Sequence, residues 1–142
     1  MRHNWGMQSA TAEALVETYL RALSNADAAL AISLFAPDGI VNSPLYGNLP
    51  AREFYPELFA DTAESVLSLR RTLLSTDATT LAFWFDFSWV LADGTPVPFT
   101  VVDIAELDEK RQITRLHIVY DTHPIRESWT RQHDARGPAG RI

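Results

Sequence analysis

The sequence predicts an α+β fold in which N-terminal helices pack on one face of an antiparallel sheet. Two observations lead to this prediction. Apolar residues recur with the period of a helix in the first half of the chain, whereas the second half holds long runs rich in Val, Ile, Thr and aromatic residues. Helices followed by consecutive strands are typical of α+β domains whose helices cover one face of the sheet.

The first helical segments lie before residue 40. Apolar residues at helical spacing over residues 12–23 predict a first helix with one buried stripe. A second helix is expected over residues 24–39, with Asn25 as its N-cap and the Pro-Asp-Gly sequence at 37–39 as its end.

A third helical region is expected over residues 49–65, before the strands begin. Pro50 fits the first turn of this helix, and Pro56 should kink the helix or divide it. Alternating, β-branched and aromatic runs then predict four strands, joined by polar turns such as Asp93-Gly94. These strands are expected over residues 65–76, 80–92, 97–107 and 112–121.

The chain of 142 residues is long enough for one domain. We expect that domain to cover residues 1–125, because the periodic pattern ends there. Residues 126–142 are rich in Arg and Gly and predict a C-terminal tail that is partly mobile and docks in part through Trp129.

Composition excludes several classes of function. The net charge is −6 and the chain has one lysine, Lys110, which argues against a nucleic-acid partner. There is no Cys, no apolar run near the ~20 residues of a membrane span, and no apolar signal core at the N-terminus. We therefore expect no membrane partner and a cytoplasmic location. No glycine-rich phosphate loop or histidine-rich metal set is present, so we expect no cofactor and no metal.

Aromatic residues fall on both faces of the strand around residues 83–89. One face carries Phe83, Phe85, Phe87 and Trp89, and the other carries Trp84, Asp86 and Ser88. Both faces should therefore be covered, one by the helices and the other by a second subunit. The sequence predicts a homodimer formed through the outer face of the sheet.

Asp103 is a carboxyl group among apolar neighbours on its strand. It shares a strand face with Phe99, Val101, Ala105 and Leu107. Ionisation is costly among such neighbours, so we expect the pKa of Asp103 to be raised. Two alternatives remain open: the face is exposed near Asp103, or Arg71 pairs with the carboxylate.

The last strand carries the richest polar cluster of the sequence. Leu116, Ile118 and Tyr120 share one face, and His117 lies on the other with Arg115, Val119 and Asp121. The apolar set should face inward, which directs His117 outward as an interface residue. A catalytic role for His117 is the alternative.

Several phrases of the sequence match one known family. The first half reads "ETYLRALSNADAALAISLFAPDGIV" followed by "REFY", and the last strands read "FTVVDIAEL" and "ITRLHIVYD". Over residues 10–122 the chain resembles the nuclear transport factor 2-like superfamily, in particular its SnoaL-like and ketosteroid isomerase-like proteins. This resemblance implies a cystatin-like cone, with a curved sheet wrapped around the first helix and a conical apolar pocket.

The resemblance also implies roles for three residues. In ketosteroid isomerases a Tyr and a protonated Asp hold the substrate oxygen while a second Asp acts as the base. The family's Tyr falls on Tyr19, its protonated Asp on Asp103 and its base on Ser43. A serine hydroxyl cannot act as a base near neutral pH, so the isomerase base is absent. A replacement remains open among four residues: Asp38, Asp86, His117 and Asp121.

We therefore expect a pocket for a small hydrophobic, oxygen-bearing molecule of steroid, terpene or polyketide type. If the protein is an enzyme, acid/base chemistry would make it an isomerase, cyclase or hydrolase, with Tyr19, Asp103 and His117 as catalytic residues. Ligand contacts are expected from Tyr19, Ser43, Phe54, Phe99, Val101, Asp103, Leu116 and Ile118. The alternative is a non-catalytic ligand-binding or dimerisation module with the same fold.

Overall fold

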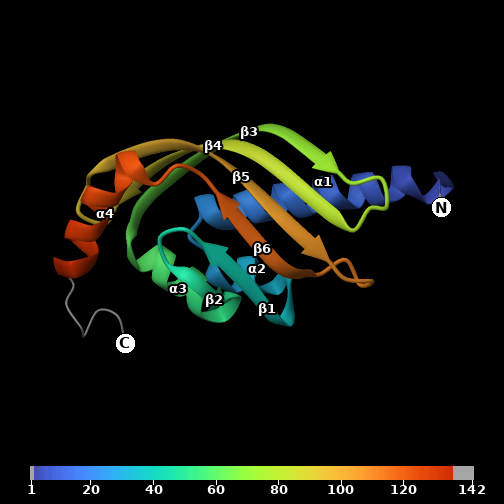
Figure 1. The fold of residues 1–142 in the computed structure, drawn as a ribbon, viewed down its shortest axis with the longest axis horizontal. Coiled ribbons are helices and arrows are strands. Elements are labelled where there is room, and N and C mark those ends of the chain that lie inside the picture. Colours follow the sequence, from blue (N-terminus) through green and yellow to red (C-terminus); the bar gives the residue numbers. More distant parts are fainter. Residues whose placement is uncertain (1, 136–142) are drawn as a thin grey trace.

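The computed structural model describes the chain from Arg2 to Ala135 (Figure 1). Its helices are α1 (Arg2–Ser24), α2 (Ala28–Ser33), α3 (Ala51–Ala60) and α4 (His123–Ala135). Its strands are β1 (Phe35–Ser43), β2 (Gly47–Pro50), β3 (Thr62–Leu74), β4 (Thr80–Leu91), β5 (Pro96–Leu107) and β6 (Ile113–Val119). The predicted α+β architecture is confirmed.

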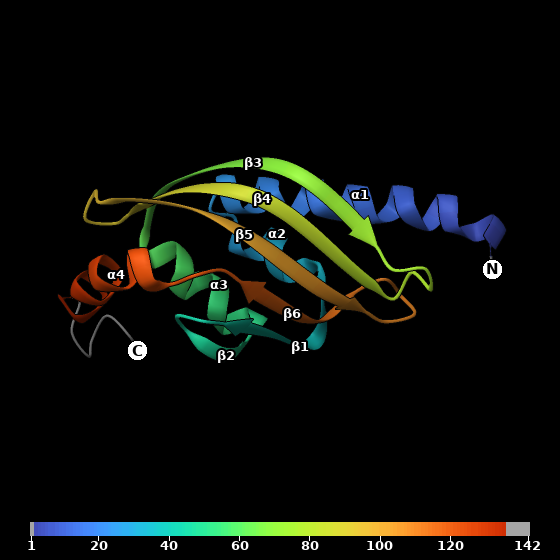
Figure 2. The ribbon, with the colours of Figure 1, turned by 45° about the horizontal axis from the view of Figure 1, so that its top comes forward.

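The six strands form one sheet in the order β2-β1-β6-β5-β4-β3. All neighbours are antiparallel except β1 and β6, which run parallel. The long strands β3, β4 and β5 arch over α1, and α2 and α3 lie on the same side of the sheet (Figures 1 and 2). The core lies between this concave face and the helices, as expected for a cone.

The predicted second helix is wrong in its extent. Helix α2 covers only residues 28–33, and its N-cap is Asp27, which accepts a hydrogen bond from the Leu30 N–H at 3.0 Å. Helix α1 continues to Ser24, and Ala26 has a φ of 51°, a left-handed conformation, just after the end of that helix. Asn25 therefore lies at the C-terminal end of α1 and does not cap α2. The Pro-Asp-Gly sequence therefore lies inside β1 and does not terminate a helix.

Gly39 lies where the pairing of β1 with β6 is irregular, between Phe35 and Ile40. A Cβ atom at this position would lie 2.8 Å from the Phe35 ring and 2.9 Å from the Ile113 carbonyl oxygen. Only glycine fits so close an approach. The sequence that resembles a helix stop is thus a bulge that brings β1 against the core.

The third helical region is confirmed, but α3 covers only Ala51–Ala60, so the expected range of residues 49–65 is too long, and Pro50 is the N-cap of the helix and does not lie in its first turn. Pro56 lies inside α3, and the helix is not divided there. The four predicted strands correspond to β3–β6, with β3 beginning three residues earlier than expected. The aromatic alternation of β4 holds: its even-numbered aromatic, Trp84, is 37% exposed, whereas the odd-numbered set is buried.

The C-terminal segment differs from the predicted tail. Residues 123–135 form α4, so the boundary expected after residue 125 falls inside a continuous helix. Trp129, Gln132 and His133 lie on one face of α4 and are buried, and the expected docking through Trp129 is therefore observed. Residues 136–142 of the predicted tail lie outside the described part of the chain. No helix within residues 2–135 is long and apolar enough to cross a membrane.

Candidate functional site

A pocket lies on the concave side of the sheet and has an empty volume of about 440 Å³, including its open mouth. Two helices, α1 and α3, and two strands, β4 and β5, supply most of its wall. The lining residues are Tyr19, Leu23, Ser43, Tyr46, Phe54, Leu58, Phe85, Phe87, Trp89, Phe99, Val101, Asp103, Ile118 and Tyr120. Most of them are aromatic or aliphatic, with a few polar groups among them, which is typical of a small-molecule site.

Asp103 is placed in this wall by the register of β5 against β4. It lies opposite Phe83, and its side chain is inside the molecule with 2% exposure. Burial raises the pKa of Asp103 well above the usual range of an aspartate, and a hydrogen bond from Tyr19 opposes this only in part. Its Oδ1 atom has no hydrogen-bond partner within the described residues. Burial therefore favours the neutral form of Asp103, whose Oδ1 atom has unused hydrogen-bonding capacity in the pocket wall, and Arg71 does not pair with it.

Tyr19 lies beside Asp103 and is held by Tyr55. The Tyr55 hydroxyl donates to the Tyr19 hydroxyl at 2.9 Å, and the two rings meet edge to face. Burial raises the pKa of both phenols well above their usual range, so both keep their hydrogens. Because Tyr19 accepts from Tyr55, its own hydrogen remains available to Asp103 or to a ligand oxygen.

Ser43 ends β1 and lines the pocket as a small polar residue. Its Oγ accepts hydrogen bonds from the backbone N–H groups of Leu45 at 3.2 Å and Tyr46 at 3.1 Å. The hydroxyl that stands at the family's base position therefore closes the turn between β1 and β2. The hydroxyl keeps its own hydrogen for a further partner, and it supplies no base.

None of the four alternative bases lines the pocket. Asp38 and Asp121 are exposed, and Asp86 lies on the outer face of the sheet. Hydrogen bonds from Arg70 and Thr100 lower the pKa of Asp86, which makes it a weaker base. Among the lining residues, Asp103 is the sole carboxyl group.

His117 lies on the outer face of the sheet, as its place in the strand pattern predicts. Its Nε2 atom is 2.6 Å from Glu106 Oε2, and its Nδ1 atom is 3.1 Å from Asn42 Nδ2. It does not line the pocket, so the expected catalytic role has no geometric support. Leu116 is buried in the core and does not line the pocket either. All other residues expected to contact a ligand do line it.

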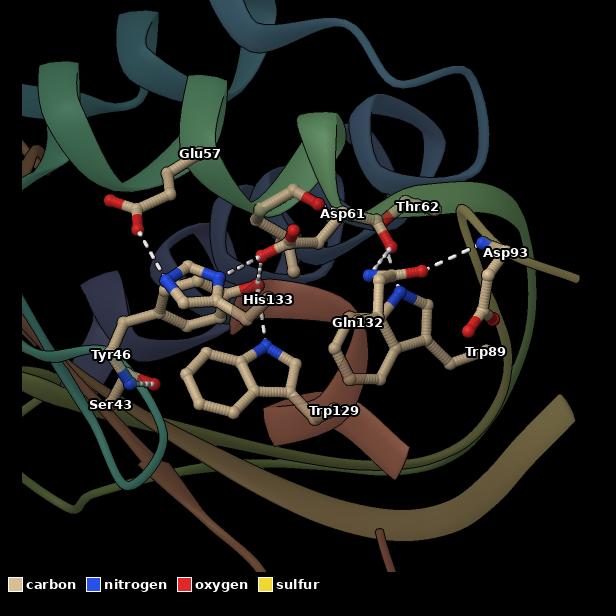
Figure 3. Close-up of polar contacts among 11 residues, drawn as sticks. Ser43, Tyr46, Glu57, Asp61, Thr62, Trp89, Asp93, Trp129, Gln132 and His133 are labelled. Carbon is tan, nitrogen blue, oxygen red and sulfur yellow. Dashed lines mark hydrogen bonds and ion pairs between the residues drawn. The ribbon is translucent and has the colours of Figure 1, made fainter. Parts of the chain in front are cut away.

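A second polar cluster borders the pocket, and the sequence analysis missed it (Figure 3). The Tyr46 hydroxyl donates to Asp61 Oδ2 at 2.5 Å and accepts from Trp129 Nε1 at 3.0 Å. His133 Nδ1 lies 3.2 Å from the same Asp61 oxygen, and its Nε2 lies 3.6 Å from Glu57 Oε1. We call Tyr46, Glu57, Asp61, Trp129 and His133 the Asp61 cluster.

Helix α4 is fixed to the body of the protein beside this cluster. Gln132 donates from Nε2 to the Asp61 carbonyl oxygen at 3.2 Å and accepts from the Asp93 N–H at 2.7 Å. The Trp129 and His133 rings stack with centroids 4.5 Å apart (Figure 3). No periodic pattern predicts contacts across some 70 residues. The only available signal was the spacing of Trp129, Gln132 and His133 on one helix face.

The family model described as the SnoaL-like domain matches residues 16–116 of the chain. The protein therefore belongs to the SnoaL-like family within the nuclear transport factor 2-like superfamily. None of the curated proteins compared with the chain matches it.

Solved structures with similar folds share little sequence with the chain. SalBIII, an epoxide hydrolase/cyclase-like enzyme with a role in pyran ring formation in the polyether salinomycin, has a TM-score of 0.69 at 14% identity, with 82% of this chain and 95% of that chain covered. TerC, co-crystallized with polyporic acid, has a TM-score of 0.69 at 15% identity, covering 84% and 98%. An LEH-like epoxide hydrolase from M. tuberculosis has a TM-score of 0.65 at 18% identity, covering 87% and 92%. At these identities the likeness shows the fold alone.

Proposed function

We propose that the protein binds a small hydrophobic, oxygen-bearing molecule of steroid, terpene or polyketide type and acts on it by acid/base chemistry. The observation that carries this proposal is the burial of Asp103 beside Tyr19 in the wall of the pocket, which raises the pKa of Asp103 and favours its neutral form. Two hydrogen-bond donors that converge in an apolar site favour a carbonyl, ether or epoxide oxygen.

A neutral carboxylic acid can do more than bind such an oxygen. It stabilises negative charge that develops on the oxygen, or transfers its proton as the charge forms. The names of the structural neighbours agree with this chemistry, since two of them are epoxide hydrolase or epoxide hydrolase/cyclase-like enzymes. An isomerase, cyclase or hydrolase reaction at the ligand oxygen is therefore the activity we propose.

A non-catalytic ligand-binding module is the second candidate. It is favoured by one observation: Ser43 stands at the base position, and among the described residues that line the pocket Asp103 is the sole carboxyl group. Liquid chromatography coupled to mass spectrometry, applied to steroid, terpene and polyketide enones and epoxides incubated with the protein, separates the two candidates, because it resolves products of unchanged mass. Turnover that disappears in Asp103→Leu supports the enzyme, and tight binding without any turnover supports the module.

Calorimetric titration with a phenolic steroid tests the shared part of both candidates. Asp103→Asn keeps a donor and should bind with a modest loss, whereas Asp103→Leu should lose about 1–3 kcal/mol. Asp86→Leu removes an aspartate from the outer face and serves as the control. Equal affinities of the wild type and both Asp103 variants would contradict the proposal.

A further inference from the structure

Tyr46 lines the pocket, and the hydrogen of its hydroxyl group is already engaged. Its one hydrogen is donated to Asp61 Oδ2, and one acceptor position of its oxygen is taken by Trp129 Nε1 (Figure 3). A phenolic oxygen has a further acceptor position. Because the hydrogen is already committed, any additional partner of this oxygen must be a donor.

The surroundings of Asp61 keep the hydrogen in place. Asp61 is fully buried, and the same Oδ2 atom faces His133 Nδ1. Burial and the negative charge of Asp61 raise the pKa of Tyr46 far above its usual range, so Tyr46 keeps its hydrogen. A hydrogen bond of 2.5 Å to a carboxylate is among the strong ones. Turning the Tyr46 hydrogen toward a ligand would break this bond.

The Tyr46 ring is also held rigidly in the pocket wall. Its backbone N–H donates to Ser43 Oγ, and the ring meets Phe54 and Trp129 edge to face with centroids 5.5 Å and 5.2 Å away. Ser43 thus acts on the pocket through the turn that presents Tyr46.

Asp103 and Tyr46 therefore offer a ligand opposite hydrogen-bonding groups. Neutral Asp103 donates, and Tyr46 accepts. We propose that the ligand of this pocket carries two oxygens of different kinds, an acceptor oxygen held by Asp103 and a hydroxyl that donates to Tyr46. This inference rests on the proposed function, because it concerns the ligand of the same pocket.

The arrangement selects against close analogues. A ketone or ether oxygen placed at Tyr46 would bring two acceptors together and leave both without a hydrogen. A site that hydrogen-bonds a hydroxyl discriminates against an analogue that lacks one, because its polar groups are left unpaired. The substrate class is thus a hydroxyketone or a related hydroxylated carbonyl or ether compound.

Titration of the wild type with four steroid ketones tests the inference directly. They differ only at the end opposite the ketone, which carries a hydrogen, a hydroxyl, a methoxy group or a second ketone. The hydroxyl compound should bind about 3- to 10-fold more tightly than the unsubstituted one. The methoxy compound and the diketone should bind no more tightly than the unsubstituted compound. A second series on a bicyclic ketone covers a shorter span between the two oxygens.

Two variants assign the effect to Tyr46 and Asp61. In Tyr46→Phe the affinity ratio between the hydroxyl and unsubstituted compounds should fall to unity. In Asp61→Asn the new amide can donate to Tyr46 and release its hydrogen, so the preference should reverse toward the diketone. Asp86→Asn, the same change on the outer face, is the matched control and should retain the wild-type order.

The outcomes separate this inference from the proposed function. A hydroxyl ratio of unity in the wild type, or a ratio that survives Tyr46→Phe, overturns the inference. If ketone binding depends on Asp103 but the hydroxyl and unsubstituted compounds bind equally well, the proposed function is kept and this inference is rejected. If no compound binds, both are rejected. Thermal unfolding checks that the variants fold, and the wild-type series decides the question if they do not.

Discussion

The hydroxyl of Tyr55 donates a hydrogen bond to the hydroxyl of Tyr19 across 2.9 Å in the interior of the protein. This single bond sets the direction of the donors in the pocket. Tyr19 accepts this hydrogen bond from Tyr55, so the hydrogen of its own hydroxyl is left for Asp103 or for a ligand. Tyr19 therefore acts on a ligand directly, and Tyr55 acts through Tyr19.

The direction of the hydrogen bond from Tyr55 to Tyr19 predicts that removing the two hydroxyl groups has unequal effects. Tyr19→Phe removes a donor from the pocket and should weaken binding of a steroid ketone about tenfold. Tyr55→Phe removes only the supporting bond, and should lower the free energy of unfolding by about 1 kcal/mol with a smaller loss of affinity. Calorimetric titration and urea unfolding of both variants measure these effects. A larger affinity loss in Tyr55→Phe would contradict the order.

The raised pKa of Asp103 predicts a distinct dependence of stability on pH. Unfolded, Asp103 has a pKa of about 3.9, and burial raises the folded value above this. Between the two values only the folded state holds the proton, so Asp103 lowers stability as pH rises through this window. Asp103→Asn should therefore gain stability relative to the wild type, by up to about 1.4 kcal/mol per pH unit above about pH 4.

Urea unfolding of both proteins at several pH values measures this difference. Asp86→Asn is the control, and its effect on stability should depend on pH in the opposite way, because hydrogen bonds lower the pKa of Asp86 in the folded state. Its removal should cost stability at neutral pH and less in acid. Parallel pH profiles of the wild type and Asp103→Asn would show that Asp103 ionises normally.

Ser43→Asp should introduce steroid isomerase activity. An aspartate can accept the two backbone N–H groups that Ser43 now accepts, and still direct one oxygen into the pocket. A general base contributes about 10²–10⁴-fold in rate. We expect no turnover of a β,γ-unsaturated steroid ketone by the wild type, and in Ser43→Asp a rate about 10²-fold or more above that of the uncatalysed reaction.

Ser43→Asn matches the shape of the aspartate without its basicity, and it should remain inactive. An absorbance assay of the conjugated product follows all three proteins. Robust turnover by the wild type would mean that another residue already supplies a base for this substrate.

We propose that a second copy of the chain covers the outer face of the sheet. Val66, Leu73, Trp84 and Val119 are exposed there, and Arg70 contacts both Trp84 and Asp86. A face with apolar groups and charges of both signs can pair with itself about a two-fold axis. Sedimentation should give twice the chain mass of 15.9 kDa.

Val119→Glu places a charge in this face and should yield the monomer. Met7→Glu makes the same kind of change at an exposed position of α1 and should leave the dimer intact. A wild type that sediments as a monomer at micromolar concentration would reject this proposal.

Much of the fold follows from local patterns. The period-two alternation of β4 and β5 placed Phe85, Val101 and Asp103 on the inner face, and the register confirms that placement. The patterns failed where local chemistry was ambiguous. Pro37 and Gly39 resemble a helix stop, but they form a bulge in β1 because the backbone packs against Phe35 and β6.

The candidate site was only half accessible from the sequence. Asp103 and Tyr19 lie within strongly periodic segments, and the family resemblance directed attention to them. Asp61 and His133 lie in segments with no clear period, and they meet across 72 positions of the chain. Contacts of that kind depend on how α4 docks, which no pattern of spacing along the chain encodes.

The functional proposals for this pocket depend on Asp103 being a neutral acid. Carbon-13 NMR of labelled aspartate carboxyl groups measures this most directly, with the Asp103 signal assigned by its absence in Asp103→Asn. We expect this carboxyl carbon to keep the chemical shift of the protonated form at neutral pH, both in the free protein and with a steroid ketone bound. A signal that titrates near the ordinary value of about 3.9 would contradict it.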